Sequence, residues 1–207
     1  MIAADFAKLA HERAPFMDGA DWGDHRNNEK WMEFFQNRKF TNAAVLIPII
    51  DRPDGAQVLF TYRSVRLNKH AGQISFPGGK IDPEDKFVEA AALRELNEEI
   101  GVDRSDVPMP VAMPQYLSGS GFRVHPVIGV IPADAPMTLN PDEVESTFEV
   151  PLSFLMDGQS VMKSSRDDLV DGLRVYFYEY VYEGHRIWGI TAGIVNSIRR
   201  ALFEGQI

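Results

Sequence analysis

Three glutamates within five residues, Glu95, Glu98 and Glu99, restrict the fold of this sequence more than any other feature. On a helix of 3.6 residues per turn they share one face, within an arc of roughly 100°. Carboxylates spaced three or four residues apart on a helix repel one another by about 0.2–0.5 kcal/mol per pair. We therefore expect a cation to compensate this face, and hard oxygen ligands on one wall suit Mg²⁺ or Mn²⁺.

The residues on either side of the glutamates predict a loop, a helix and a stop. The opposite face of the helix is apolar and can pack on a core; it is formed by Leu93, Leu96 and Ile100. The segment 82–85, Asp-Pro-Glu-Asp, is typical of a helix start, with Asp82 as the N-cap and the proline in the first turn. Gly101 follows the last turn as a C-cap. Ahead of the helix, Gly78 and Gly79 predict a tight turn that brings the backbone close to the metal site.

Four potential cations precede the acidic stretch, within residues 63–75: Arg63, Arg66, Lys69 and His70. Such a cluster beside an acidic metal site can form a wall that binds anions. For Arg66 and Lys69 we favour the alternative, which is that they are solvated loop charges. For Arg63 and His70 a binding role and a structural role are equally well supported.

From Gly79 to Val102 the sequence resembles the Nudix box, whose pattern is Gly-x5-Glu-x7-Arg-Glu-(aliphatic)-x-Glu-Glu-x-Gly-(aliphatic). The second half of the pattern matches in full, from Arg94 to Val102. The first half departs from it, because Asp85 stands at the place of the first glutamate and eight residues, rather than seven, separate it from Arg94. The general resemblance covers residues 40–200.

The departure is itself similar to one subgroup of the family, the coenzyme A pyrophosphatases, which carry Gly-Gly-Lys-x-Asp-Pro-x-Asp before the helix. The same subgroup has a second signature just upstream. Here its matching positions are Leu59-Phe60-Thr61-Tyr62-Arg63-Ser64, Leu67, His70, Gly72 and Phe76-Pro77-Gly78-Gly79. The two adjoining motifs span about 45 residues, so together they make the resemblance specific.

The resemblance implies an α/β fold of the Nudix type, an α/β/α sandwich whose mixed β-sheet is flanked by the glutamate helix and the C-terminal helix. Residues 41–207 would form the Nudix hydrolase domain, and residues 1–40 a helical N-terminal extension. The extension contains apolar residues at the spacing of a short amphipathic helix: Ile2, Phe6 and Leu9. For this extension we favour packing against the body over a lid or a homodimer contact. Within it, His25 is expected at the surface.

The family resemblance also implies roles for the residues of the box. Glu95, Glu98 and Glu99 would bind the metal, with the carbonyl oxygen of Gly79 as a further ligand. Arg94 would orient the acids by pairing with one of them, such as Glu98 four residues on. The alternative for Arg94 is a purely structural surface pair.

Nudix enzymes often recruit one more glutamate from outside the box, as a metal ligand or a base. Glu143 is our candidate and Glu145 the second. Both stand in an acidic cluster that fits a solvated turn equally well. The sequence leaves open whether Glu98, Glu99 or Glu143 is the general base.

The resemblance implies an enzyme that hydrolyses the diphosphate bond of coenzyme A and its derivatives, with Mg²⁺ or Mn²⁺ as the cofactor. The products would be 3′,5′-ADP and 4′-phosphopantetheine or its acylated form. The substrate-binding positions would be Arg63, His70, Gly72 and Gly78. The alternatives are another substrate (ADP-ribose, NADH or a nucleoside triphosphate), a non-catalytic domain that senses a nucleotide, or a solvated acidic helix face.

Segments outside the motifs predict the strands and the helix that complete the fold. Apolar runs at residues 43–50 and 57–63 predict a hairpin around the turn Pro53-Asp54-Gly55. Further strands are expected at residues 110–117, 122–131, 173–182 and 185–188, with a closing amphipathic helix at 191–202.

Composition narrows the class of protein. A length of 207 residues suits one domain with a sizeable core. The net charge of −9 argues against a general nucleic-acid-binding protein. The absence of cysteine excludes disulfides and thiolate metal sites, and no apolar run reaches the roughly 18 residues of a membrane span. We expect a cytoplasmic protein whose partner is a small nucleotide of the coenzyme A type.

Overall fold

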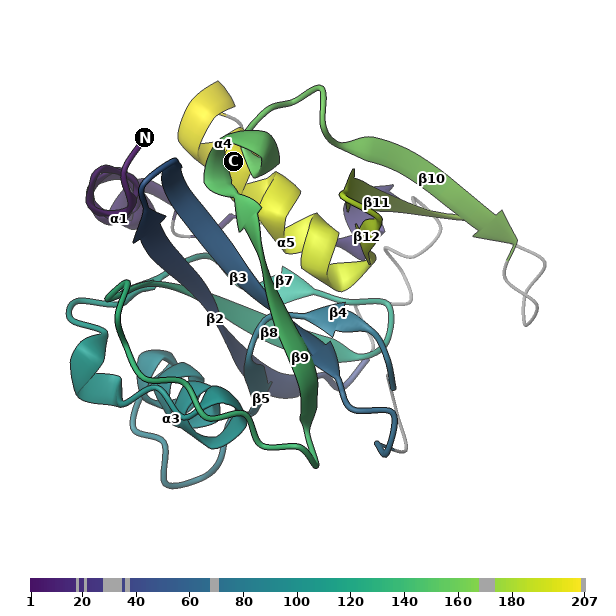
Figure 1. Ribbon diagram of the computed structural model, residues 1–207. Coiled ribbons are helices and arrows are strands. Elements are labelled where there is room, and N and C mark those ends of the chain that lie inside the picture. The colour runs from purple at the N-terminus through teal and green to yellow at the C-terminus, as the bar shows by residue number, and fades with distance from the viewer. Residues whose placement is uncertain are drawn as a thin grey trace.

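The computed structural model describes residues 1–17, 19–20, 22–27, 35, 38–67, 71–167 and 174–205. Within these residues the strands form two sheets, a mixed sheet of nine strands and an antiparallel sheet of three. The mixed sheet forms the body of the molecule, and the smaller sheet extends from it (Figure 1).

The long apolar run after residue 40 forms the central strand of the mixed sheet. β2 (Thr41–Arg52) pairs in parallel with β8 (Phe122–Ile131) and antiparallel with β3 (Gly55–Arg63) and β5 (Gly78–Lys80). Because both faces of β2 are covered, its sequence is continuously apolar rather than alternating. The predicted hairpin of the first two strands is confirmed.

Shorter strands complete the edges of this sheet: β1 (Trp22–Gly23), β4 (Ile74–Ser75), β6 (Val111–Ala112), β7 (Tyr116–Leu117) and β9 (Val144–Pro151). β9 and β4 pair with β3, β6 and β7 pair with β8, and β1 runs parallel to β7. The strand predicted at 110–117 is therefore two short strands. Pro114 stands between them, and a proline has no N–H to donate to a ladder.

Helices cover both faces of the mixed sheet, which confirms the predicted sandwich (Figure 1). One face carries α3 (Val88–Ile100), and the other carries α5 (Ile190–Arg199), a π-helical turn at 200–204 and α1 (Ala3–Arg13). The buried apolar side chains divide in the same way, one cluster under α3 and the other under α1 and α5. None of the described helices is long and apolar enough to cross a membrane.

Short helical turns connect these elements: η1 (Ala14–Met17), η2 (Asp24–Asn27), η3 (Arg104–Asp106) and α4 (Leu152–Leu155). The smaller sheet consists of β10 (Met162–Asp167), β11 (Arg174–Tyr182) and β12 (His185–Trp188). The His185 ring stacks on Phe148 of β9, with ring centroids 4.0 Å apart. This contact holds the smaller sheet against the body.

The glutamate helix begins later than the sequence predicted. Residues 82–85 form a turn, in which Asp85 N donates to the Asp82 carbonyl oxygen at 3.0 Å, and α3 starts only at Val88. The Asp85 carboxylate accepts hydrogen bonds from Asp82 N and from Arg94, both at 2.9 Å. These contacts hold the acidic segment as a turn, so the predicted N-cap at Asp82 is wrong. At the other end of α3, the predicted C-cap is confirmed by a left-handed φ of 76° at Gly101.

The N-terminal helix is part of the core. Phe6 of α1 is 1% exposed, and Asp51 at the end of β2 accepts a hydrogen bond from Ala3 N at 2.6 Å, which anchors the first turn. Packing against the body, the favoured interpretation of this segment, is thus confirmed for α1. His25 was expected at the surface, and this was wrong. It is buried beside the ring of Phe35.

We expect Phe6→Ala to lower the free energy of unfolding by about 3–5 kcal/mol, because it removes a buried ring and leaves a cavity. Ile2→Ala, at a residue that is 52% exposed just before the same helix, should change it by less than about 0.5 kcal/mol. Urea unfolding of both variants measures the difference. Equal, small effects would show that α1 is not part of the cooperative core.

Candidate metal centre

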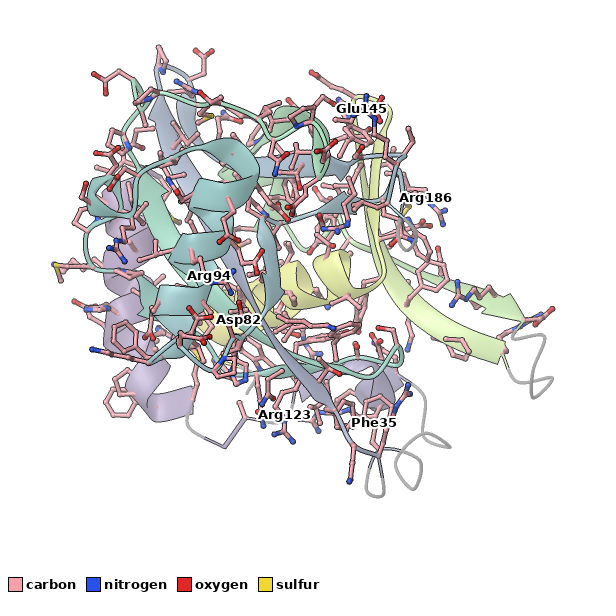
Figure 2. All side chains as sticks on the ribbon, turned by 90° about the horizontal axis from the view of Figure 1, so that it is seen from below. Phe35, Asp82, Arg94, Arg123, Glu145 and Arg186 are labelled. Carbon is pink, nitrogen blue, oxygen red and sulfur yellow. The ribbon has the colours of Figure 1, made fainter. Side chains whose placement is uncertain are left out.

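Three carboxylates from two parts of the chain meet beside α3. Glu95 and Glu99 lie one turn apart on the helix, and Glu143 comes from the turn before β9. One oxygen of each lies within 4.8 Å of the others, and we call these three residues the carboxylate group. Glu145, the second candidate from this region, is exposed, and Figure 2 shows it well away from Arg94 of α3. Buried oxygen ligands of this kind are typical of a divalent-cation site.

Two glycines before the helix let the backbone reach these carboxylates. They lie in β5, and not in the tight turn that the sequence predicted. A Cβ atom on Gly79 would lie 2.5 Å from Cδ of Glu95, so only a glycine leaves room for this carboxylate. The backbone N–H of Gly78 favours the charged form of Glu99 and so opposes the rise in its pKa. The backbone therefore approaches the acids closely, but it does so in a strand and not in a turn.

Hydrogen bonds to both α3 and β3 hold Glu143 in the carboxylate group. Asn140 N donates to the carbonyl oxygen of Glu99 at 2.9 Å, which ties the turn to the end of α3. Ser64, just after β3, donates its N–H to the carbonyl oxygen of Glu143 at 2.8 Å. The side-chain amide of Asn140 also donates to a Glu143 carboxylate oxygen at 3.4 Å. The position of Glu143 thus depends on two segments far from it in the sequence.

Arg94 joins the acidic face of α3 to the segment before the helix. Its Nη1 donates to Glu95 at 2.9 Å and to Glu98 at 3.0 Å. On the other side, Nη2 and Nε donate to the two oxygens of Asp85 at 2.9 and 3.3 Å, and Nη2 donates to a carbonyl oxygen of β5 at 3.0 Å. Figure 2 shows Asp82 close to Arg94, with a separation of 3.7 Å between the charged atoms. One guanidinium therefore orients two of the three glutamates of the box.

Burial makes two members of the carboxylate group, Glu95 and Glu99, costly to ionise. It raises the pKa of Glu99 to about 8, and the nearby carboxylates of Glu95 and Glu143 act in the same direction. The Arg63 guanidinium opposes this shift. Burial also raises the pKa of Glu95, against the hydrogen bond from Arg94 that favours its charged form.

One carboxylate oxygen lacks a partner among the described residues. Glu99 Oε2 is buried and makes no hydrogen bond, while Oε1 lies 3.5 Å from Nη1 of Arg63. A buried acceptor without a partner costs about 1–3 kcal/mol, and more when it is charged. A divalent cation among the three carboxylates would satisfy it. The donor set contains only oxygen, so the residues fit a hard ion such as Mg²⁺ or Mn²⁺.

The other predicted site residues lie around this group at different depths. The side chain of Glu98 is 51% exposed and lies outside the carboxylate group. Gly72, in the loop after β3, donates its N–H to the carbonyl oxygen of Arg63 at 3.0 Å. His70 falls outside the residues that the structure describes.

Apart from Arg94, the sequence did not identify the residues that position these acids. Ser64 and Asn140 hold Glu143, and Asp85 holds Arg94. All three lie within motifs or clusters that stand out in the sequence. Their place in those motifs is the signal that could have identified them. Their roles depend on contacts between distant segments, such as the 3.2 Å bond of Ser64 Oγ to a carbonyl oxygen 77 residues further on.

Comparisons with known proteins cover the segments that supply these residues. A family model described as the NUDIX domain matches residues 40–153. A protein named "Uncharacterized Nudix hydrolase NudL" from Escherichia coli O7:K1 is 41% identical over 165 residues, which are 78% of this chain and 84% of that protein. A protein of the same name from Shigella boydii serotype 4 is 42% identical with the same coverage. The matched region of the family model contains all three members of the carboxylate group.

Solved structures give a more distant likeness. A MutT/nudix family protein from Enterococcus faecalis aligns with 83% of this chain and 67% of its own chain, at 14% identity and a TM-score of 0.47.

We expect the affinity of this protein for Mn²⁺ to rise with pH up to about 8 and to level off above it. Only the ionised Glu99 carboxylate can ligate a metal, and its pKa of about 8 without metal keeps it protonated at lower pH. The affinity should therefore fall by up to about tenfold for each pH unit below 8. Calorimetric titrations from about pH 6 to 9 measure this. A constant affinity across that range would contradict the protonated state of Glu99.

Proposed function

The chain belongs to the Nudix hydrolase family, and we propose that it hydrolyses the diphosphate bond of coenzyme A and its derivatives. The products would be 3′,5′-ADP and 4′-phosphopantetheine or its acylated form. Family membership makes the chain a pyrophosphohydrolase, and it implies a small substrate of the nucleoside diphosphate type. Coenzyme A as the substrate, and Mg²⁺ or Mn²⁺ as the cofactor, are our proposals.

The observation that carries the proposal is the contact between the two sequence motifs at the carboxylate group. Arg63, from the upstream signature, lies 3.5 Å from Glu99 of the box. A register shift between Tyr62 and Arg63 in the β3–β9 ladder marks a bulge, a feature that re-aims side chains next to active sites. The motif that separates the coenzyme A subgroup from other Nudix enzymes therefore adjoins the proposed metal ligands.

The carboxylate group would hold the metal through Glu95, Glu99 and Glu143, and we propose the carbonyl oxygen of Gly79 as a further ligand. A divalent ion held there would neutralise charge on the diphosphate and lower the pKa of a water molecule. In the hydrolysis, the water oxygen forms a bond to phosphorus and the bridging P–O bond breaks. A carboxylate accepts the proton that the water releases, and the leaving phosphate carries away the bridging oxygen.

Glu98 is our preferred general base. It lies beside the carboxylate group but outside it, and its side chain is 51% exposed, so it can accept a proton without giving up a metal ligand. The hydrogen bond from Arg94 keeps it oriented. Glu143 remains the second candidate, because it belongs to the group and comes from a separate segment.

Arg63 is our candidate for binding the substrate phosphates. Its side chain is 24% exposed at the edge of the carboxylate group, and a guanidinium can bind two phosphate oxygens at once. Gly72 and Gly78 bring the backbone of the signature segment close to it and to the acids. We keep His70 in the same role as a sequence-based proposal.

Substitution of single glutamates should separate the base from the ligands. Glu98→Gln is expected to lower kcat by about 10²-fold or more while Mn²⁺ affinity stays near the wild-type value, because a base is lost and a ligand is not. Glu143→Gln should lower both kcat and Mn²⁺ affinity. Glu145→Gln, at an exposed acid two residues after Glu143, should lower neither quantity. Steady-state kinetics and Mn²⁺ titration of the three variants measure these effects. Full activity of Glu98→Gln would assign the base elsewhere.

The substrate is tested by product analysis with Mg²⁺ or Mn²⁺ on coenzyme A, ADP-ribose, NADH and nucleoside triphosphates. We expect coenzyme A to have the highest kcat/KM and to yield 3′,5′-ADP. Arg63→Gln should raise KM for coenzyme A, because the phosphate contact is lost. Turnover of another compound with coenzyme A left intact would overturn the substrate assignment and leave the family membership unaffected.

A further inference from the structure

The smaller sheet has one edge that lies away from the body of the molecule. Its strands run in the order β10, β11 and β12. β12 is held against the body, where a hydrogen bond of 2.9 Å joins Nδ1 of His185 to the Tyr62 hydroxyl. β10 pairs only with β11 among the described residues, and Figure 1 shows it on the outside of the molecule. Its outer edge therefore presents a row of backbone N–H and C=O groups to which another strand can add.

β10 lacks two features that usually protect such an edge. Its ladder with β11 runs through all six residues without a register shift, and it contains no proline. β9 provides a contrast, because within the described part of the chain it too pairs with a single strand, β3. The β3–β9 ladder has a register shift near the start of β9, and β9 ends at Pro151. A bulge and a proline both disfavour the addition of a strand, so β10 is the better edge for pairing.

The charges of β10 fit a second copy of the same strand. A lysine on an edge strand ordinarily opposes pairing. Lys163 and Asp167 stand two residues on either side of Ser165, so all three lie on one face of the strand. When two copies of β10 run antiparallel about a two-fold axis at Ser165, Lys163 of each copy lies opposite Asp167 of the other. An axis at Lys163 or at Arg166 would instead place that cation opposite itself, which is unfavourable.

Both charged groups can make this contact. Lys163 forms no ion pair or hydrogen bond with the residues that the structure describes, and its Nζ lies 5.2 Å from the ring centroid of Tyr176. The side chain of Asp167 is 73% exposed, and its Oδ1 lies 3.1 Å from Nε of Arg174 on β11. Because a carboxylate has two oxygens, Asp167 can accept from Arg174 on one side and from a lysine on the other.

We propose that β10 is a homodimer contact, in which two copies of this chain pair their β10 strands antiparallel about a two-fold axis at Ser165. The pairing joins two three-stranded sheets into one continuous sheet. A two-fold contact uses the same edge in both copies, so it closes at a dimer. An interface of two short strands is small, and the dimer is therefore weak and depends on concentration. This inference is independent of the proposed substrate.

Sedimentation velocity of the full chain tests the association itself. The two copies each carry a net charge of −9, and about 0.15 M salt screens their long-range repulsion. Between about 1 µM and 1 mM protein, we expect the mass to rise from monomer to dimer and no further. A monomer over the whole range, or growth beyond a dimer, would overturn the proposal.

Charge reversal tests where the copies meet. Lys163→Asp and Asp167→Lys each place like charges opposite one another twice in the dimer, so each should raise the dimer Kd by about tenfold or more. The double variant exchanges the charges and should restore the wild-type Kd to within about threefold. Within one chain the two residues stand four apart on a strand, roughly 13 Å, so such a rescue can only arise between copies.

A matched variant controls for the change in net charge. Lys8→Asp makes the same change as Lys163→Asp, at a lysine of α1 whose side chain is 76% exposed. It should leave the dimer Kd within about threefold of the wild-type value. An equal effect of Lys8→Asp, or no rescue in the double variant, would overturn the assignment of the contact to β10.

A single cysteine gives a readout that does not depend on charge. The chain contains no cysteine, so Ser165→Cys introduces the only thiol, directly opposite its own copy. Opposite Cα atoms in an antiparallel pair lie roughly 4.5–5.5 Å apart, which suits a disulfide. We expect mild oxidation to yield a covalent dimer, while Ser146→Cys, at an exposed serine of β9, stays monomeric. Equal cross-linking of the two variants would contradict the proposed pairing.

Discussion

Repulsion among three neighbouring carboxylates, two of them buried, is the constraint on which the metal centre depends. One oxygen each of Glu95, Glu99 and Glu143 lies within 4.8 Å of the others, and burial opposes the ionisation of Glu95 and Glu99. Two guanidiniums offset part of this cost, Arg94 from the same helix and Arg63 from β3. A divalent cation among the carboxylates would offset the rest of this cost. The arrangement therefore disfavours the empty, fully charged site and favours metal binding.

The mixed sheet divides the buried apolar side chains into two clusters. The α3 side carries the carboxylate group, and the other side carries α1 and α5. Because β2 is apolar from Ala43 to Ile50 and covered on both faces, it separates the two sides of the sheet as a low-dielectric layer.

Local patterns predicted the elements well where one short segment decides the structure. The apolar runs became β2, β3 and β8, and Gly101 ended α3. The predictions failed where a distant contact competes with a local preference. Asp85 is held in a turn by Arg94 and not in a helix start, and His25 is buried by packing that no pattern in its own segment shows.

The sequence by itself determined the chemistry of this site: the spacing of the glutamates, the glycine that leaves room for one of them, and the arginine that pairs with them. Only the tertiary structure decided which acids gather. Helical periodicity fixes the angles between side chains on α3, but packing against the sheet sets how the helix is rotated, and it leaves Glu98 half exposed. Contacts of Ser64 and Asn140 then bring Glu143 to the group, because hydrogen bonds between segments far apart in the chain exist only once the sheet has formed.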